Sequence, residues 1–78
     1  MKLGKISPLA FSRMRERGIS MDALNHLLAH GEIEKRFDDG AQVVTLDCAD
    51  YRPKRTLYAV VDAAGEVLTV EKRVRSRR

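Results

Sequence analysis

The sequence predicts an α+β fold, in which an N-terminal helical hairpin packs on one face of a four-stranded antiparallel sheet. Two adjoining segments carry helix start and stop signals, and the later segments are strand-like and separated by turns that contain Gly. Two helices followed by consecutive hairpin-linked strands are typical of a helical layer over an antiparallel sheet. With 78 residues the chain has room for one domain, which we expect to span residues 1–78.

The first helix is predicted over residues 8–17. Ser7 is a favourable N-cap, and Pro8 stands at the first helical position, where its missing N–H is not needed. Gly18 supplies the left-handed residue that commonly ends a helix. Apolar residues recur at spacings of three and four, so we expect one buried stripe made of Leu9, Ala10, Phe11 and Met14. The residues before Ser7 are expected to be a frayed lead-in rather than an edge strand.

The second helix is predicted over residues 21–30. Ser20 caps it, Asp22 opposes the helix dipole in the first turn, and Gly31 ends it. Its inner face is expected to consist of Leu24, Leu27 and Leu28. A pair of helices with one apolar face each needs a surface to bury against, and the rest of the chain offers strands for that purpose.

Four strands are predicted, at residues 32–37, 41–48, 56–62 and 66–74. Asp39-Gly40 is a hairpin signal between the first two, and Gly65 lies in the turn before the last. In the first strand Ile33 and Phe37 are expected on one side. The third strand is apolar on both faces, so we place it centrally in the sheet. The segment 49–55 is predicted to be an exposed loop.

Composition suggests an acidic partner. Lys and Arg total 15 and Asp and Glu total 11, which gives a formal net charge of +4. Because the planar guanidinium group binds phosphate and carboxylate well, we expect either nucleic acid or an acidic protein. The alternative is a solvated surface with a basic tail, since net charge determines solubility and non-specific binding before it determines function.

The cysteine content, the lack of long apolar segments and the small size of the chain suggest its compartment and its oligomeric state. The single cysteine, Cys48, excludes an internal disulfide, and its place on an apolar strand predicts a buried structural thiol. With no apolar signal segment and no membrane-spanning run, we expect a cytoplasmic protein that has no membrane contact. The small core makes a homodimer an option.

The usual catalytic patterns are missing from the sequence. It has no glycine loop of the phosphate-binding type. His26 and His30 have the i, i+4 spacing of a zinc pair, but no HExxH frame surrounds them, and two ligands alone do not make a site. We therefore expect no metal and no other cofactor.

Basic residues are the strongest chemical feature of the chain. They form three groups, at the end of the first helix (Arg13, Arg15, Arg17), in the loop (Arg52, Lys54, Arg55) and at the C-terminus (Lys72, Arg73, Arg75, Arg77, Arg78). If the final strand lies near the first helix, two of the groups would form one groove for a polyanion. The alternative is a short charged tail, with residues 75–78 disordered, plus arginines that interact favourably with the helix dipole.

A metal-free RNA cleavage site could be made from such residues. It needs a group that takes the 2′-hydroxyl proton, cations for the pentavalent phosphate, and an acid for the leaving oxygen. Residue spacing does not choose among the candidates for proton transfer, which are Glu71, Lys72, Tyr51 and Tyr58, with His26 and His30 less well placed.

The N-terminal half resembles a known family. The run Ser7-Pro8-Leu9-Ala10, followed by Arg13 and by Arg17-Gly18-Ile19-Ser20, resembles the opening of the domain-of-unknown-function family 4258. The likeness extends over roughly residues 6–71 and includes the pattern around Gly65. That family is similar to the RelE and BrnT toxins of bacterial toxin–antitoxin pairs. The resemblance implies a small α+β fold, mRNA endoribonuclease activity and control by a bound antitoxin.

The chain departs from the family pattern at two places. Leu9 stands where the family often has His, and Glu71-Lys72 follow the Thr-Val pair of the last strand, where the family often has an aromatic residue or His. Both departures favour a degenerate toxin or a plain binding module.

The leading hypothesis is a RelE/BrnT-like toxin that cleaves mRNA without a metal. Arg13, Arg17, Arg73 and Arg75 would bind phosphate, and Glu71 and Lys72 would transfer protons. A second hypothesis is a non-catalytic basic module that binds nucleic acid or an acidic protein through the same arginines. A third is an interaction protein whose exposed sheet edge pairs with another chain. The first two require that the arginines of the first helix and of the last strand converge.

Overall fold

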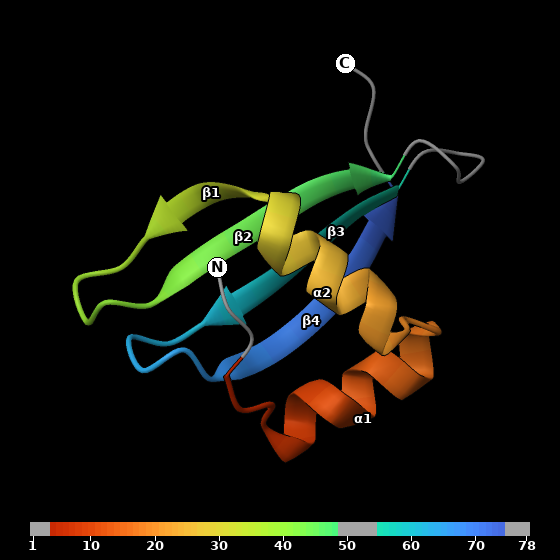
Figure 1. Ribbon diagram of the computed structural model, residues 1–78, viewed down its shortest axis with the longest axis horizontal. Coiled ribbons are helices and arrows are strands. Elements are labelled where there is room, and N and C mark those ends of the chain that lie inside the picture. Colours follow the sequence, from red (N-terminus) through yellow and green to blue (C-terminus); the bar gives the residue numbers. More distant parts are fainter. Residues whose placement is uncertain (1–3, 49–54, 75–78) are drawn as a thin grey trace.

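The computed structural model describes residues 4–48 and 55–74 of the chain. The elements are α1 (Pro8–Arg17), α2 (Met21–His30), β1 (Glu32–Arg36), β2 (Gln42–Cys48), β3 (Arg55–Val61) and β4 (Val67–Val74) (Figure 1). The strands form one antiparallel sheet in the order β1-β2-β3-β4, so β3 is an interior strand as predicted. The predicted α+β fold, two helices followed by a four-stranded antiparallel sheet, is confirmed.

Three predictions fall on parts of the chain outside the described residues. These are residues 49–54 of the predicted loop with Tyr51, the basic tail at residues 75–78 with Arg75, and the side chain of Cys48. The last residue of the predicted loop, Arg55, instead begins β3, where its backbone pairs with Cys48 and Val74. Among the described residues, neither helix is long and apolar enough to cross a bilayer.

The two helices pack on different strands. α1 lies against β4, whereas α2 lies against β2 and β3. In Figure 1, α2 crosses in front of the middle of the sheet, and α1 lies beside its β4 edge. One face of the sheet is therefore covered by α2, and no described helix lies over the opposite face.

Local caps define both helices where the sequence predicted them. The side-chain oxygen of Ser7 accepts a hydrogen bond from the Ala10 N–H at 3.0 Å, and that of Ser20 accepts one from the Ala23 N–H at 3.0 Å. Gly18 has φ +68°, and its left-handed backbone lets the Ile19 N–H donate to the Met14 carbonyl at 2.8 Å. Because these signals are local, both helices begin and end at the predicted residues.

The predicted apolar stripe of α1 is wrong in part. Ala10 and Met14 are buried, but Leu9 and Phe11 have exposed fractions of 56% and 51%. The physical reason is the position of α1 at the margin of the sheet, where it meets β4 and buries only a narrow strip of its surface. The interior-facing residues of α2 are Leu24, Leu27 and Leu28, as predicted.

The N-terminal residues also differ from the prediction, because the chain just before α1 pairs with β4 and is not frayed. Ile6 forms a parallel bridge with Val67. The Ser7 N–H donates to the Val67 carbonyl at 2.9 Å, and the Val67 N–H donates to the Lys5 carbonyl at 2.8 Å. The Ser7 hydroxyl also donates to the Leu68 carbonyl at 3.0 Å. These bonds set the start of α1 against β4.

The first strand is irregular. β1 is an edge strand whose residues are all exposed, and its register with β2 shifts between Ile33 and Lys35. This bulge breaks the alternation that placed Ile33 and Phe37 on one side, and both side chains remain more than 40% exposed. A bulge and charged residues are common ways in which proteins protect an edge strand from further pairing.

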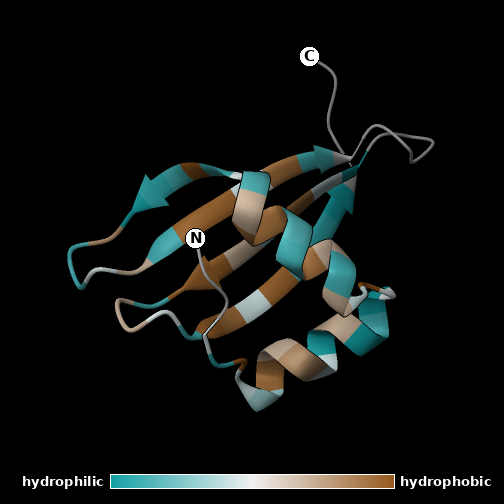
Figure 2. Cartoon of the chain, in the orientation of Figure 1, coloured by the Kyte–Doolittle hydropathy of each residue, from teal (hydrophilic) through white to brown (hydrophobic). Residues whose placement is uncertain are grey.

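Strand alternation separates the two faces of the sheet. Leu57, Ala59 and Val61 of β3 belong to the hydrophobic core, which also includes Val44 and Val70 and is covered by the helices. We call the opposite side the open face. The registers place on it Val43, Thr45 and Asp47 of β2, Thr56, Tyr58 and Val60 of β3, and Thr69, Glu71 and Arg73 of β4. Figure 2 shows the middle of the sheet as mainly hydrophobic, whereas β1 and the far end of β4 are mainly hydrophilic.

Candidate nucleic-acid interface

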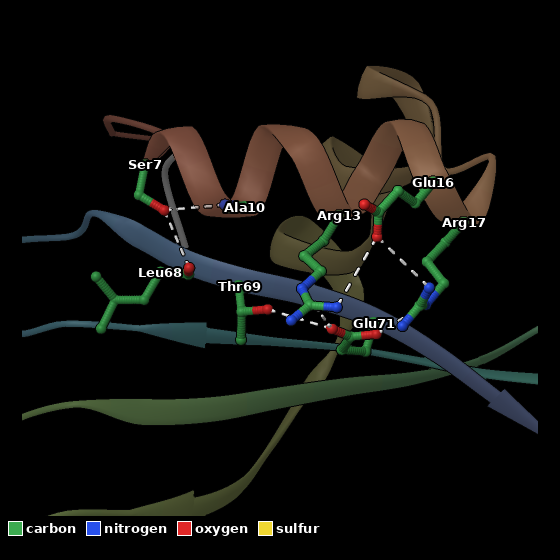
Figure 3. Close-up of polar contacts among 8 residues, drawn as sticks. All are labelled: Ser7, Ala10, Arg13, Glu16, Arg17, Leu68, Thr69 and Glu71. Atoms are coloured by element: carbon green, nitrogen blue, oxygen red, sulfur yellow. Dashed lines mark hydrogen bonds and ion pairs between the residues drawn. The ribbon is translucent and has the colours of Figure 1, made fainter.

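Two arginines of α1 meet one glutamate of β4. The Nε of Arg17 donates to Oε1 of Glu71 at 3.0 Å, and the Nε of Arg13 lies 3.7 Å from Oε2 of the same carboxylate (Figure 3). The side chain of Glu71 is only 19% exposed, and those of Arg13 and Arg17 are 40% and 39% exposed. One partly buried carboxylate is thus held between two guanidinium groups that face solvent.

The position of α1 makes this meeting possible. Arg13 and Arg17 are four residues apart, so they lie on the same side of the helix. Glu71 is the register partner of Tyr58 and lies on the open face. Because α1 lies at the β4 edge, its arginines can reach past that edge to a residue of the open face. Figure 3 shows both side chains extending from the helix to Glu71.

Two more side chains complete what we call the Arg–Glu cluster. Oε1 of Glu16 lies 3.8 Å from Nη1 of Arg13 and 3.8 Å from Nη1 of Arg17. The Thr69 hydroxyl donates to Oε2 of Glu71 at 3.5 Å, which is a long hydrogen bond. The cluster therefore contains two cations and two anions, and its members are Arg13, Glu16, Arg17, Thr69 and Glu71.

Arg73 adds a third guanidinium group to the open face. Its central carbon lies 4.9 Å from the centroid of the Tyr58 ring, within the range of a cation–π interaction. Its Nη2 lies 3.6 Å from Oε2 of Glu34. Arg73 is two residues beyond Glu71 on the same face of β4, so it stands next to the Arg–Glu cluster.

Lys72 does not share this face. Its register partner is Leu57, a core residue, so the Lys72 side chain starts on the side of the sheet that carries the helices. Consecutive residues of a strand point to opposite faces, and the prediction that both Glu71 and Lys72 serve in proton transfer did not take account of this. Of the two residues proposed for proton transfer, only Glu71 lies with the arginines.

The described arginines of the site already have carboxylate partners. Arg13 and Arg17 pair with Glu71 and Glu16, and Arg73 pairs with Glu34. A phosphate group would have to compete with these carboxylates for the guanidinium groups. The roles of Glu16, Glu34 and Thr69 were not predicted from the sequence. The alternation of Thr69, Glu71 and Arg73 along one strand could have indicated a shared face.

The two histidines are not part of the site. The rings of His26 and His30 on α2 lie 4.6 Å apart between centroids, and both residues are exposed. Within residues 4–48 and 55–74, no group of three or more His, Cys, Asp or Glu side chains could hold a metal ion.

Comparison of the chain with protein-family models, with curated proteins and with solved structures found no match. The relationship to the domain-of-unknown-function family 4258 therefore stays a prediction. A function has to be inferred from the contacts of the open face.

Proposed function

We propose that the protein is a metal-independent endoribonuclease of the RelE/BrnT type, which binds RNA across the open face and cleaves it at the Arg–Glu cluster. The observation that supports this most is the approach of Arg13 and Arg17 to Glu71, at 3.7 Å and 3.0 Å. It brings a proton acceptor and two phosphate-binding groups together from distant parts of the chain. In this proposal the protein works in the cytoplasm, and a bound antitoxin keeps it inactive.

Each of these groups has a defined part in the reaction. The Glu71 carboxylate accepts the proton of a 2′-hydroxyl group, and the 2′-oxygen attacks the adjacent phosphorus. The guanidinium groups of Arg13 and Arg17 stabilise the extra negative charge on the pentavalent phosphate. The bond from phosphorus to the 5′-oxygen then breaks. The products are a 2′,3′-cyclic phosphate and a 5′-hydroxyl end, and neither water nor a metal is consumed.

The leaving oxygen needs a proton, and Tyr58 is the described residue best placed to supply one. It is the register partner of Glu71 on the neighbouring strand, and its ring contacts Arg73. The Tyr58 side chain carries an O–H group that can donate to the departing 5′-oxygen. Arg73 would hold the adjacent phosphate. Lys72 has no part in this scheme, because it starts on the other face of the sheet.

An incoming phosphate has a way into the cluster. The 3.7 Å contact between Arg13 and Glu71 is longer than a charge-assisted hydrogen bond, which spans about 2.7–2.9 Å, so it is the weaker of the two contacts. Arg13 can turn toward a phosphate while Arg17 continues to hold Glu71. The solvent-facing guanidinium groups make this exchange possible without a change in the backbone.

Cleavage of RNA in the presence of EDTA tests the proposal. We expect the purified protein to release fragments with cyclic phosphate and 5′-hydroxyl ends. Glu71→Gln should lower the rate by about 100-fold or more, because general base catalysis contributes at least that much. Glu66→Gln is the matched control, since Glu66 precedes the opposite end of β4, and it should keep the wild-type rate. Intact RNA at high protein concentration, or equal activity in the two variants, would refute the proposal.

The second candidate is a non-catalytic module that binds nucleic acid through the same arginines. The observation that favours it over catalysis is that Glu71, the proposed base, is already engaged by both Arg13 and Arg17, as a carboxylate in a purely structural ion-pair network is. Glu71→Gln separates the two candidates. It removes one of the two carboxylate charges near Arg13 and Arg17 and leaves Glu16 in place, so RNA should bind more tightly in both cases. Only the nuclease loses a cleavage activity that the wild type possesses.

A further inference from the structure

The outer side of α1 exposes apolar residues that the fold does not use. Leu9 and Phe11 have the largest exposed fractions among the exposed large apolar side chains of the described residues, at 56% and 51%. The helix is anchored to the sheet by other residues, since Ala10 and Met14 are buried and Arg13 and Arg17 bind Glu71. A single exposed apolar residue needs no explanation, but Phe11 has the exposed Pro8 three residues before it on the same side of the helix, and two such neighbours mark a candidate interaction surface. Leu9, two residues before Phe11, faces another side of the helix.

One face of the helix forms a shallow hollow of about 490 Å³. Its lining residues are spaced like one side of an α-helix, and we call them the outer stripe: Pro8, Phe11, Ser12, Arg15 and Glu16. Leu9 borders the stripe, because it lies three residues before Ser12 and seven before Glu16. An apolar end near Phe11 is thus followed by a polar end near Arg15.

The charge of the outer stripe is not balanced. Glu16 lies 3.8 Å from both Arg13 and Arg17, so its carboxylate is already engaged on the side of the Arg–Glu cluster. Arg15 takes part in none of the ion pairs found among the described residues, and it is exposed. Lys5, just before the helix, is exposed as well. The stripe therefore presents apolar surface beside positive charge, which is complementary to an acidic partner.

A helical partner fits this surface better than an extended one. Between its two ends, α1 uses its backbone N–H and C=O groups within the helix, so it offers no row of free groups with which an added strand could pair. Contact must therefore be made by side chains. An amphipathic helix presents side chains at the i, i+3, i+4 and i+7 spacing that the stripe itself has.

We propose that the outer stripe of α1 is a docking surface for an acidic amphipathic helix of a partner protein. An apolar side chain of the partner packs on Phe11, and a carboxylate binds Arg15. The inference does not depend on the proposed ribonuclease activity, because a partner on the outer stripe contacts neither Glu71 nor Tyr58.

The test uses a fluorescein-labelled synthetic peptide of about 18 residues, in which Leu and Glu alternate at helical spacing. A peptide of the same composition in shuffled order and a peptide with Lys in place of Glu serve as controls. We expect fluorescence anisotropy to show saturable binding of the first peptide alone. Backbone amide chemical shifts in ¹⁵N NMR spectra should change mainly at residues 9–16, since Pro8 has no N–H.

Two matched pairs of variants locate the surface. Phe11→Ala and Arg15→Glu should each weaken binding about tenfold or more, as residues at the centre of an interface do. Phe37→Ala and Arg36→Glu alter an exposed aromatic residue and an exposed arginine outside α1, and they should change the affinity by less than about twofold. All four side chains are exposed, so circular dichroism should show the same fold in every variant.

Three outcomes would overturn the proposal. The first is equal binding of the acidic, shuffled and Lys-containing peptides, or no binding at all. The second is that the amide chemical shifts change at residues of the open face and not at residues of the outer stripe. The third is self-association of the chain that Phe11→Ala abolishes in sedimentation experiments, because the occupant would then be a second copy of this chain.

Discussion

At the scale of single residues, Gly31 is a position with no space for a side chain. A β-carbon there would lie 2.8 Å from the Thr45 carbonyl oxygen and 2.8 Å from Cγ1 of Val44, and closer still to the Leu27 carbonyl oxygen. Most of these atoms belong to the backbone of α2 and β2, so they cannot move aside as a flexible side chain would. The junction between α2 and β1 therefore depends on the small size of glycine.

We predict that Gly31→Ala destabilises the protein by about 3 kcal/mol, the upper end of the usual range for overpacking, because three atoms lie within 2.8 Å of the new β-carbon. Gly18→Ala is the matched control, because it makes the same chemical change where no atom lies within 4 Å of the new β-carbon. That control should lose about 1–2 kcal/mol, from the left-handed backbone at φ +68° alone.

Urea denaturation followed by circular dichroism measures both changes. The expected order is a lower midpoint for Gly31→Ala than for Gly18→Ala. Equal or reversed midpoints would mean that α2 and β2 can separate at little cost, contrary to the close contacts at Gly31.

At the scale of elements, one hydroxyl group contributes twice to the position of α1. Ser7 Oγ accepts from the Ala10 N–H and donates to the Leu68 carbonyl, both at 3.0 Å. It therefore caps the helix and also fastens it to β4. Ser20 makes only the first kind of bond in α2, to the Ala23 N–H at 3.0 Å.

We predict that Ser7→Ala lowers the free energy of unfolding by about 2 kcal/mol, from about 1 for the cap and about 1 for the second bond. Ser20→Ala should lower it by about 1 kcal/mol, since only the cap is lost. Thermal or urea unfolding of the two variants checks the difference. Equal losses would show that the bond to Leu68 adds nothing.

The helix boundaries were predictable, whereas the placement of the helices was not. Ser7, Gly18 and Ser20 act on their immediate neighbours, so sequence alone located both helices correctly. The exposure of Phe11 and the bulge in β1 depend on which strand lies at which edge. That information comes from contacts between distant residues, which periodicity within one segment does not contain.

At the scale of the whole molecule, the candidate site joins both ends of the described fold. The sequence predicted that Arg13 and Arg17 would approach the last strand, and the structure places them at Glu71. The sequence did not predict that the two arginines would reach the open face past the edge of β4, because that depends on the position of α1. It also did not predict that the Lys72 side chain would start on the opposite side of the sheet, which follows from strand alternation.

We predict that RNA binding weakens with salt according to the number of phosphates held. On single-stranded nucleic acid, each neutralised phosphate contributes about −0.7 to the slope of the logarithm of the binding constant against the logarithm of the salt concentration. If Arg13, Arg17 and Arg73 each neutralise one phosphate, that slope should be about −2. Arg73→Gln should reduce the slope to about −1.4. Gel-shift titration across salt concentrations measures both, and a flat response would exclude phosphate contact.

The bridge between Ile6 and Val67 has a consequence for how the chain reaches its native state. The nearby bond from Ser7 to Leu68 joins residues 61 positions apart, so it closes a loop that contains most of the domain. Contacts of such high order are entropically slow to form. During synthesis α1 emerges well before β4. In a nascent chain that ends before Val67, the strand against which α1 packs is absent.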